Sequence, residues 1–253
     1  MLESYIKQRL QTKDILLMTH IVIGYPSFEE SMKVVEQMVD AGVDMMELQI
    51  PFSEPMADGP VILKANQDAL KKGARVESCF EFAEQAVKKF KIPFLFMSYY
   101  NILFKYGVEK FAEKMAKIGL KGAIVPDLPP EEGEDYAYAM GKNDLSPIYI
   151  ISPTTCASRM AFLASKGSGF IYCVARKGVT GRQTEFSGGL EDYLKKCRKA
   201  VKLPLAVGFG VKNRADVEYL KGKADIAVIG SETIRIVNRD GSGAVGDFLK
   251  KLR

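Results

Sequence analysis

Short apolar runs rich in β-branched and aromatic residues alternate with amphipathic stretches of helical period along the whole chain. Eight of these runs are typical of strands, so we expect strands near residues 15–23, 43–50, 92–98, 122–126, 147–152, 169–175, 203–209 and 224–229. Strands that alternate with helices predict a parallel sheet. Eight such units in 253 residues favour a closed (β/α)8 barrel over an open doubly wound sheet.

The helical stretches carry their own start and stop signals. One is predicted to begin at Ser27, with Glu30 completing a capping box, and to end at Gly42. Two helical patterns, at 60–72 and 77–90, separate the second and third strands, so this unit carries an insertion. No linker-like or low-complexity segment interrupts the chain, which predicts a single (β/α)8 barrel domain over residues 1–253.

The composition is that of an ordinary globular protein. Apolar residues make up 47% and charged residues 26%, which excludes disordered, collagen-like and coiled-coil classes. The formal net charge is a mild +5, and lysine pairs such as Lys71-Lys72 and Lys88-Lys89 fall at the ends of helical stretches. We interpret these pairs as solvated helix ends rather than as a nucleic-acid-binding patch.

The amino terminus and the cysteine pattern favour an intracellular setting. Residues 2–6 lack the basic start and apolar stretch of a signal peptide, and no run approaches the ~18 apolar residues of a spanning helix. The four cysteines form no CxxC pair, which argues against a zinc knuckle and a disulfide framework. We therefore expect a cytoplasmic protein.

Polar residues near the carboxyl ends of the strands are the candidates for chemistry, because barrels of this kind place their active sites there. Glu47 lies in the second predicted strand, where a period of two puts it on one face with Met45 and Gln49. A carboxylate inside an otherwise apolar strand costs free energy unless it is paired. The strand leaves two interpretations open: an acid/base group for proton transfer, or the partner of a neighbouring lysine.

Asp58 belongs to the loop that follows this strand. The sequence Asp58-Gly59-Pro60 is a turn by composition, and Asp58 could simply cap the helix that starts near Pro60. The same loop could instead bring Asp58 over the barrel mouth beside Glu47. Two carboxyl groups in different environments can divide acid and base roles.

Glycine clusters follow the last three predicted strands. They are Gly178 to Gly181 within the long 176–188 loop, Gly208 to Gly210, and Gly230 followed by Ser231 at the start of a helix. Glycines let backbone N–H groups approach an anion, and a helix N-terminus adds a partial positive charge. Their position predicts a phosphorylated substrate, with turns and helix caps as the plain alternative.

Other chemistries have less support in the sequence. The only histidine, His20, has no serine or cysteine nucleophile motif and no second histidine at metal spacing, so we predict no metal site. We interpret His20 as a packed barrel residue rather than a proton carrier. Tyr172 shares a strand face with Phe170 and Val174 and could be core, although its hydroxyl would then need a buried partner. Dinucleotide and nucleoside triphosphate motifs are missing.

The segment E47-L-Q-I-P-F-S-E-P-M-A-D-G-P60, together with R176-K-G-V-T-G181, G208-F-G210 and I229-G-S231, resembles the α subunit of tryptophan synthase. The resemblance extends from I23-G-Y-P26 almost to the carboxyl terminus. It implies a phosphate-binding (β/α)8 barrel that cleaves indole-3-glycerol phosphate to indole and glyceraldehyde 3-phosphate. It also implies no cofactor in this chain and a hetero-oligomer with a pyridoxal-phosphate β subunit.

Roles for individual residues follow from the resemblance alone. Glu47 matches the general acid/base, Asp58 the carboxylate that interacts with the indole N–H, and Tyr172 a tyrosine near the glycerol portion. The phosphate cradle would consist of Gly181, Gly208, Gly210, Gly230 and Ser231. Thr180 would belong to a mobile loop that closes over the substrate.

Four residues depart from the family pattern. Gln49 replaces a glycine, Glu54 replaces an aspartate, Tyr25 replaces an aspartate in the first loop, and Lys177 adds a charge to the mobile loop. We expect Gln49 either to narrow the pocket or to hydrogen-bond Glu47. These departures raise an alternative, a weakly active subunit whose main task is to bind and activate a β partner. A third hypothesis is another phosphate-sugar barrel enzyme of isomerase or aldolase type.

Overall fold

The computed structural model describes residues 1–175, 188–208 and 210–253. Within them, nine strands form one parallel sheet in the order β5-β4-β3-β2-β1-β9-β8-β7-β6. The strands are β1 (Leu16–Val22), β2 (Met45–Gln49), β3 (Phe94–Met97), β4 (Gly122–Ile124), β5 (Ser146–Ile148), β6 (Ile150–Ile151), β7 (Ile171–Val174), β8 (Leu205–Gly208) and β9 (Ile226–Ile229). The predicted (β/α)8 barrel is thereby confirmed, and all eight predicted strands are present.

The fifth predicted strand, 147–152, is divided into two short strands on either side of Tyr149. Its first half, β5, pairs with β4, and its second half, β6, pairs with β7. The Tyr172 N–H also donates to the Tyr149 carbonyl at 3.0 Å. This divided strand therefore closes the sheet into a ring.

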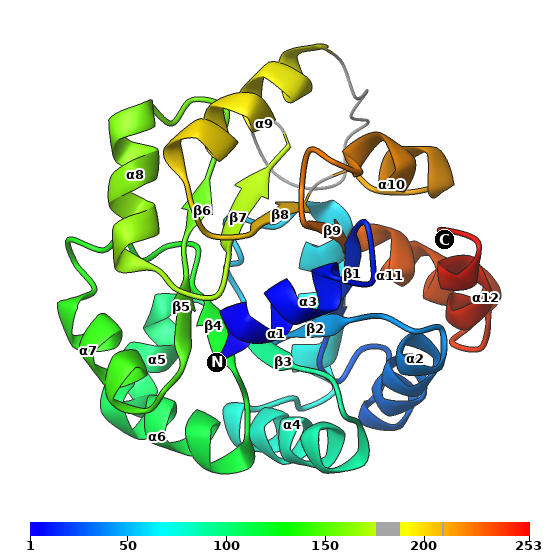
Figure 1. The fold of residues 1–253 in the computed structure, drawn as a ribbon. Coiled ribbons are helices and arrows are strands. Elements are labelled where there is room, and N and C mark those ends of the chain that lie inside the picture. Colours follow the sequence, from blue (N-terminus) through cyan, green and yellow to red (C-terminus); the bar gives the residue numbers. More distant parts are fainter. Residues whose placement is uncertain (176–187, 209) are drawn as a thin grey trace.

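Helices surround the ring (Figure 1). They are α1 (Leu2–Leu10), α2 (Phe28–Asp40), α3 (Pro60–Lys71), α4 (Val76–Lys89), α5 (Tyr100–Tyr106), α6 (Val108–Ile118), α7 (Glu134–Lys142), α8 (Ala157–Lys166), α9 (Gly188–Ala200), α10 (Arg214–Leu220), α11 (Ser231–Asp240) and α12 (Ala244–Lys250). The predicted insertion between the second and third strands is confirmed as α3 and α4. As expected, Ser27 caps α2 by accepting from the Glu30 N–H at 3.1 Å.

Side chains alternate between the two faces of each strand. Leu17, Met46 and Phe96 belong to the large core between the sheet and the helices. Leu16, Met18, Met45 and Leu95 belong to a second core inside the barrel. The period of two therefore predicts which residues of β2 point inward: Met45, Glu47 and Gln49.

Helix α1 crosses the amino-terminal end of the barrel, in the middle of the ring in Figure 1. Its Leu2 and Ile6 are buried against the interior residues Leu16 and Phe170. This helix was not among the predicted elements. It blocks the amino-terminal opening with apolar side chains, so polar groups inside the barrel face the opposite end.

Asp44, just before β2, connects the amino-terminal end of the barrel to residues near both ends of the chain. Its buried carboxylate accepts from the Leu17 N–H at 3.1 Å and meets Arg9 at 2.9 Å, Lys13 at 2.6 Å and Arg253 at 3.4 Å. One anion among three cations and a buried N–H is strongly stabilised. The N-terminal helix and the last residue are thereby linked to the barrel.

Replacing Asp44 by alanine is expected to lower the free energy of unfolding by about 3 kcal/mol, because a buried N–H and three cations lose their partner. Urea unfolding followed by circular dichroism measures the change. The matched control is Glu84→Ala, which removes only the exposed Lys88–Glu84 pair and should cost less than ~1 kcal/mol. An equal loss of unfolding free energy in the two variants would contradict the proposed stabilising role of Asp44.

The described residues contain no helix long and apolar enough to cross a membrane. All four cysteines are free thiols, and Cys156 alone among them is exposed. Burial raises the pKa of Cys79 to about 12, whereas hydrogen bonding to Ser158 and to the backbone lowers the pKa of Cys156.

Cys156 is therefore expected to react first with a disulfide reagent such as dithionitrobenzoate. Native protein should release about one equivalent of thionitrobenzoate rapidly, and the Cys156→Ser variant should lose that phase. A fast phase that survives in Cys156→Ser would show that a buried thiol is accessible.

Candidate active site

The interior of the barrel changes from apolar to polar toward the carboxyl ends of the strands. On β1, the apolar Met18 is followed two residues later by His20, and on β2 Met45 is followed by Glu47 and then Gln49. Because one strand face repeats every two residues, these polar side chains form the upper layers of the same interior. The site therefore lies at the open end, opposite α1.

Glu47 lies opposite His20 in the β1–β2 register. The His20 Nδ1 and the Glu47 Oε2 are 3.4 Å apart, and the two residues are 5% and 3% exposed. Among the residues that the structure describes, the partner of the Glu47 carboxyl group is this histidine and not a lysine, so the lysine-partner interpretation is not supported. The pair was not predicted, because its two members lie on different strands, 27 residues apart in the sequence.

Asp58 is held at the same end of the barrel by two donors. The Gln49 Nε2 donates to the Asp58 Oδ2 at 2.6 Å, and the Tyr99 hydroxyl donates to the same oxygen at 3.0 Å. Burial raises the pKa of Asp58 above its ordinary value, against these hydrogen bonds and the His20 charge, which lower it. Glu47 is close enough that its charge adds to the increase.

The alternative interpretation of Asp58 as a helix cap is wrong. Gly59 occupies the N-cap position of α3, and no side chain makes the cap hydrogen bond. The expectation that Gln49 could hydrogen-bond Glu47 is also not met, since its amide instead donates to Asp58 and, at 3.4 Å, to Asn66. Gln49 acts on the second carboxyl group rather than the first.

The loop between β2 and α3 is fixed from several sides. The Asn66 Oδ1 accepts from the Phe52 N–H at 2.9 Å, and the Tyr99 hydroxyl accepts from the Ala57 N–H at 3.1 Å. The Phe52 and Tyr99 rings stack with centroids 5.1 Å apart. These contacts involve different elements, so sequence patterns could not reveal Tyr99 and Asn66 as supports of Asp58.

Tyr172, on β7, packs against the interior core and lies near Glu47 and Asp58. Burial raises the pKa of its phenol well above the usual value, and the negative charges of Glu47 and Asp58 raise it further. Gly208, on the neighbouring strand β8, makes room for the ring: a Cβ at Gly208 would lie 2.3 Å from the Tyr172 hydroxyl. The space that the Tyr172 ring needs is therefore a sufficient reason for a glycine at position 208, whether or not a ligand binds there.

The other predicted phosphate-binding residues lie at two neighbouring strand ends. Gly210 follows β8 with φ of 139°, a backbone conformation that favours glycine, and Gly230 precedes Ser231 at the N-terminus of α11, directly after β9. The β8 and β9 strands are paired, so these segments adjoin. Gly181 and Thr180 lie outside the described residues.

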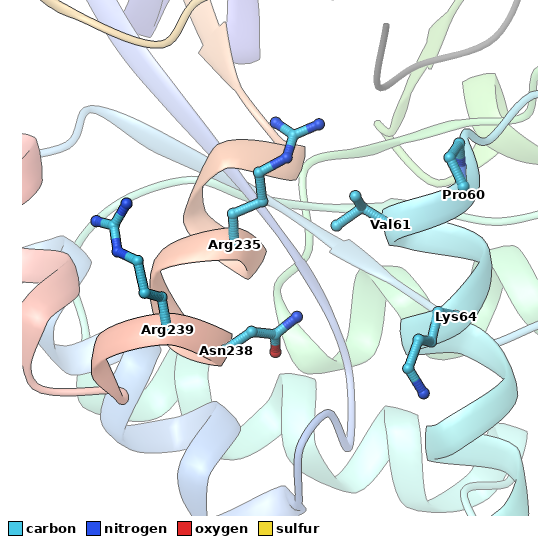
Figure 2. A pocket seen from close by; sticks show the side chains of 6 residues that line it. All are labelled: Pro60, Val61, Lys64, Arg235, Asn238 and Arg239. Carbon is cyan, nitrogen blue, oxygen red and sulfur yellow. The ribbon is translucent and has the colours of Figure 1, made fainter.

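A groove of about 380 Å³ lies beside this end of the barrel, between α3 and α11. Figure 2 shows Val61 and Lys64 on α3 and Arg235 and Asn238 on α11 at its two sides. Three cations line the groove, and each pairs with an acid of its own helix. The pairs are Lys64–Asp68, Arg235–Glu232 and Arg239–Asp240. The groove therefore presents little uncompensated positive charge. Within the described residues, no group of three metal-ligating side chains could hold a metal ion.

Two carboxyl groups, one beside His20 and the other beside Gln49 and Tyr99, thus lie at the open end of the barrel. At the same end, Gly208 is the last residue of β8 and Gly230 directly follows β9. This arrangement defines a (β/α)8 barrel enzyme of the acid/base type. Residues 6–250 match the family model for the tryptophan synthase alpha chain. The protein therefore belongs to the tryptophan synthase alpha chain family, the lyases that cleave indole-3-glycerol phosphate in tryptophan biosynthesis.

Known relatives are similar over the entire chain. It is 68% identical over 252 residues to the alpha chain of Desulforapulum autotrophicum and 65% identical over 253 residues to that of Syntrophotalea carbinolica, with all of each chain covered. Among solved structures, it is similar to tryptophan synthase from Mycobacterium tuberculosis, with a TM-score of 0.93 at 27% identity over 99% of this chain and 96% of that one. A tryptophan synthase complex from Pyrococcus furiosus includes a chain with a TM-score of 0.86 at 25% identity, over 94% of this chain and 97% of that one.

The resemblance inferred from the sequence motifs is confirmed, as are the fold class and the lyase function. The hypothesis of an isomerase or aldolase is not supported. The alternative of a weakly active binding subunit is not favoured by the family membership.

Proposed function

We propose that Glu47 and Asp58 of this chain carry the cleavage of indole-3-glycerol phosphate, with Glu47 as general acid/base and Asp58 as the group that stabilises positive charge at the indole N–H. The observation that carries this proposal is the convergence of the two carboxyl groups in the barrel mouth, one beside His20 and the other beside Gln49 and Tyr99. Their different partners suit them to different roles.

The proposed reaction is a retro-aldol cleavage. Protonation of the indole C3 makes the ring an electron sink with positive charge at nitrogen, which the carboxylate of Asp58 stabilises. The bond between C3 and the glycerol carbon then breaks, and its electrons return to the ring. The adjacent glycerol hydroxyl loses its proton as the aldehyde forms, so one proton enters, one leaves, and Glu47 can serve both transfers.

The substrate phosphate would bind across the mouth from the two acids. We assign it to the main-chain amides around Gly208, Gly210 and Gly230, with the Ser231 end of α11, since a helix N-terminus favours an anion. Gly181 would complete the cradle, and Thr180 would belong to the loop that closes over it. Tyr172 would contact the glycerol portion.

The relatives of the chain also support a proposal for its partner and for the cofactor of that partner. The relatives include tryptophan synthase complexes, which supports a hetero-oligomer with a β subunit. Pyridoxal phosphate would belong to that β subunit, and the α chain would need no cofactor of its own. A cytoplasmic location remains a prediction of the sequence.

The test is release of indole from indole-3-glycerol phosphate by the purified chain, alone and with a β subunit added. We expect measurable release by the chain alone and faster release in the complex. Failure to release indole even with the β subunit present would overturn the proposed function.

A further inference from the structure

The histidine beside Glu47 is the only histidine of the chain, and it lies where barrel interiors are usually apolar. His20 and Glu47 are register neighbours on β1 and β2, and both are almost completely buried. Burying an imidazole and a carboxyl group costs free energy unless each satisfies the other. Their shared contact, Nδ1 to Oε2 at 3.4 Å, provides that compensation.

A histidine with a purely structural role would have both ring nitrogens hydrogen-bonded. Among the described residues, neither the His20 Nε2 nor the Glu47 Oε1 has a hydrogen-bond partner. The pair therefore uses one polar atom of each member internally. Gln49 lies near the imidazole and Tyr172 near Glu47, but neither makes a hydrogen bond that satisfies the other atom. A substrate bound in the barrel mouth is the natural partner for the unpaired carboxyl oxygen.

The surroundings favour a proton on this pair. Burial alone would lower the pKa of His20, but the hydrogen bond to Glu47 and the negative charges of Glu47 and Asp58 raise it above its usual value. On the side of β9 and α11, His20 meets Gly230 and Thr233, whose hydroxyl donates to the His20 carbonyl at 3.2 Å. Neither of these two residues titrates. Within the described residues, the charged groups that act on the imidazole are the carboxyl groups of Glu47 and Asp58, and the phenol of Tyr172, whose pKa is raised well above its usual value, lies near Glu47.

We propose that His20 is a positioning residue of the lyase reaction, which holds Glu47 through Nδ1 and shares one proton with it. The inference rests on the proposed role of Glu47. Moving the proton from Nδ1 to Oε2 converts imidazolium and carboxylate into neutral imidazole and carboxylic acid. The pair keeps a net charge of zero in both forms, so Glu47 can become the acid without taking a proton from solvent.

The first test needs no activity. Because the chain has a single histidine, the imidazole resonances of histidine-labelled protein can be assigned without ambiguity and followed by NMR against pH. We expect the midpoint to lie above ~6.5 in the native protein and to fall by at least about one pH unit in Glu47→Gln. A midpoint that does not move in Glu47→Gln would overturn the pairing.

The second test is the pH profile of indole release in His20→Phe and His20→Asn. We expect His20→Phe to lower kcat by about 10- to 100-fold, with KM changed less than about threefold. His20→Asn, which keeps a neutral donor, should recover part of this loss. In both variants the alkaline limb of kcat should move to lower pH, because the pair no longer retains a proton on the imidazole.

Thr19→Val is the matched control, since Thr19 is the buried neighbour on the opposite face of β1. It should leave the pH profile unchanged, and circular dichroism checks that all variants are folded. An alkaline limb that stays in place in both His20 variants would overturn the inference while leaving the lyase proposal intact. If the native chain releases no indole at all, the lyase proposal fails, and the NMR titration still decides whether His20 and Glu47 share a proton.

Discussion

Replacing Glu47 by glutamine is expected to lower kcat for indole release by about 10³-fold, within the 10²- to 10⁴-fold range of general acid–base catalysis. The substitution keeps the size and the hydrogen-bonding shape of the side chain but removes the transferable proton. Because Glu47 is the partner of the buried His20, the free energy of unfolding should also fall, by about 1 to 3 kcal/mol. Steady-state indole release and urea unfolding measure the two quantities.

Glu54→Gln is the matched control for this prediction. Glu54 lies in the loop that follows the same strand and is exposed to solvent, so its carboxylate is not part of the interior site. Assayed without a β subunit, the control should keep kcat within about twofold of the native value. A Glu47→Gln variant that retains more than a tenth of the native kcat would remove Glu47 from the acid/base role.

Replacing Asp58 by asparagine is expected to lower kcat/KM for indole release by about 10²-fold, because a preorganised negative charge beside the developing positive charge is lost. Asparagine can still accept from Gln49 and Tyr99, so the loop should keep its place. Asp68→Asn removes an acid from the exposed face of α3 and should have no effect on kcat/KM.

The pH dependence of kcat/KM gives a second test of the role of Asp58, because it reports the ionisation of its carboxyl group. Its pKa is raised in the folded protein, chiefly by burial, so the ionised form is lost at a higher pH than for an exposed aspartate. We expect the acid limb of kcat/KM to move to still higher pH in Gln49→Leu, because the donor that favours the carboxylate is removed. An acid limb that is unchanged in Gln49→Leu and Asp58→Asn would show that another group produces it.

Much of the fold could be predicted from the sequence because the signals are local. Apolar runs of strand length, separated by amphipathic stretches, predict eight strands, and all eight are present. The division of 147–152 at Tyr149 could not be predicted, since it depends on the strand pairing with β4 on one side and β7 on the other. Helix α1 was missed, although its Leu2 and Ile6 are buried against residues from several strands.

The candidate site was predicted in part. The strand period of two placed Glu47 in the interior, and the motif around Asp58 suggested a second acid at the same end. The supports of both acids were not predictable, because His20, Tyr99 and Asn66 come from other strands and helices. Gln49 was expected either to narrow the pocket or to hydrogen-bond Glu47, whereas the loop geometry brings its amide to Asp58.

Periodicity and motif spacing are properties of neighbouring residues, so they were enough to predict the barrel, the two faces of the second strand and the family. Which face points inward, and which groups touch the two acids, depends on the tertiary structure. Those contacts join residues from different strands, helices and loops, as His20 on β1 meets Glu47 on β2, and closure of the barrel alone brings them within hydrogen-bonding distance. The protonation of the site depends on these contacts, since burial and neighbouring charge set it.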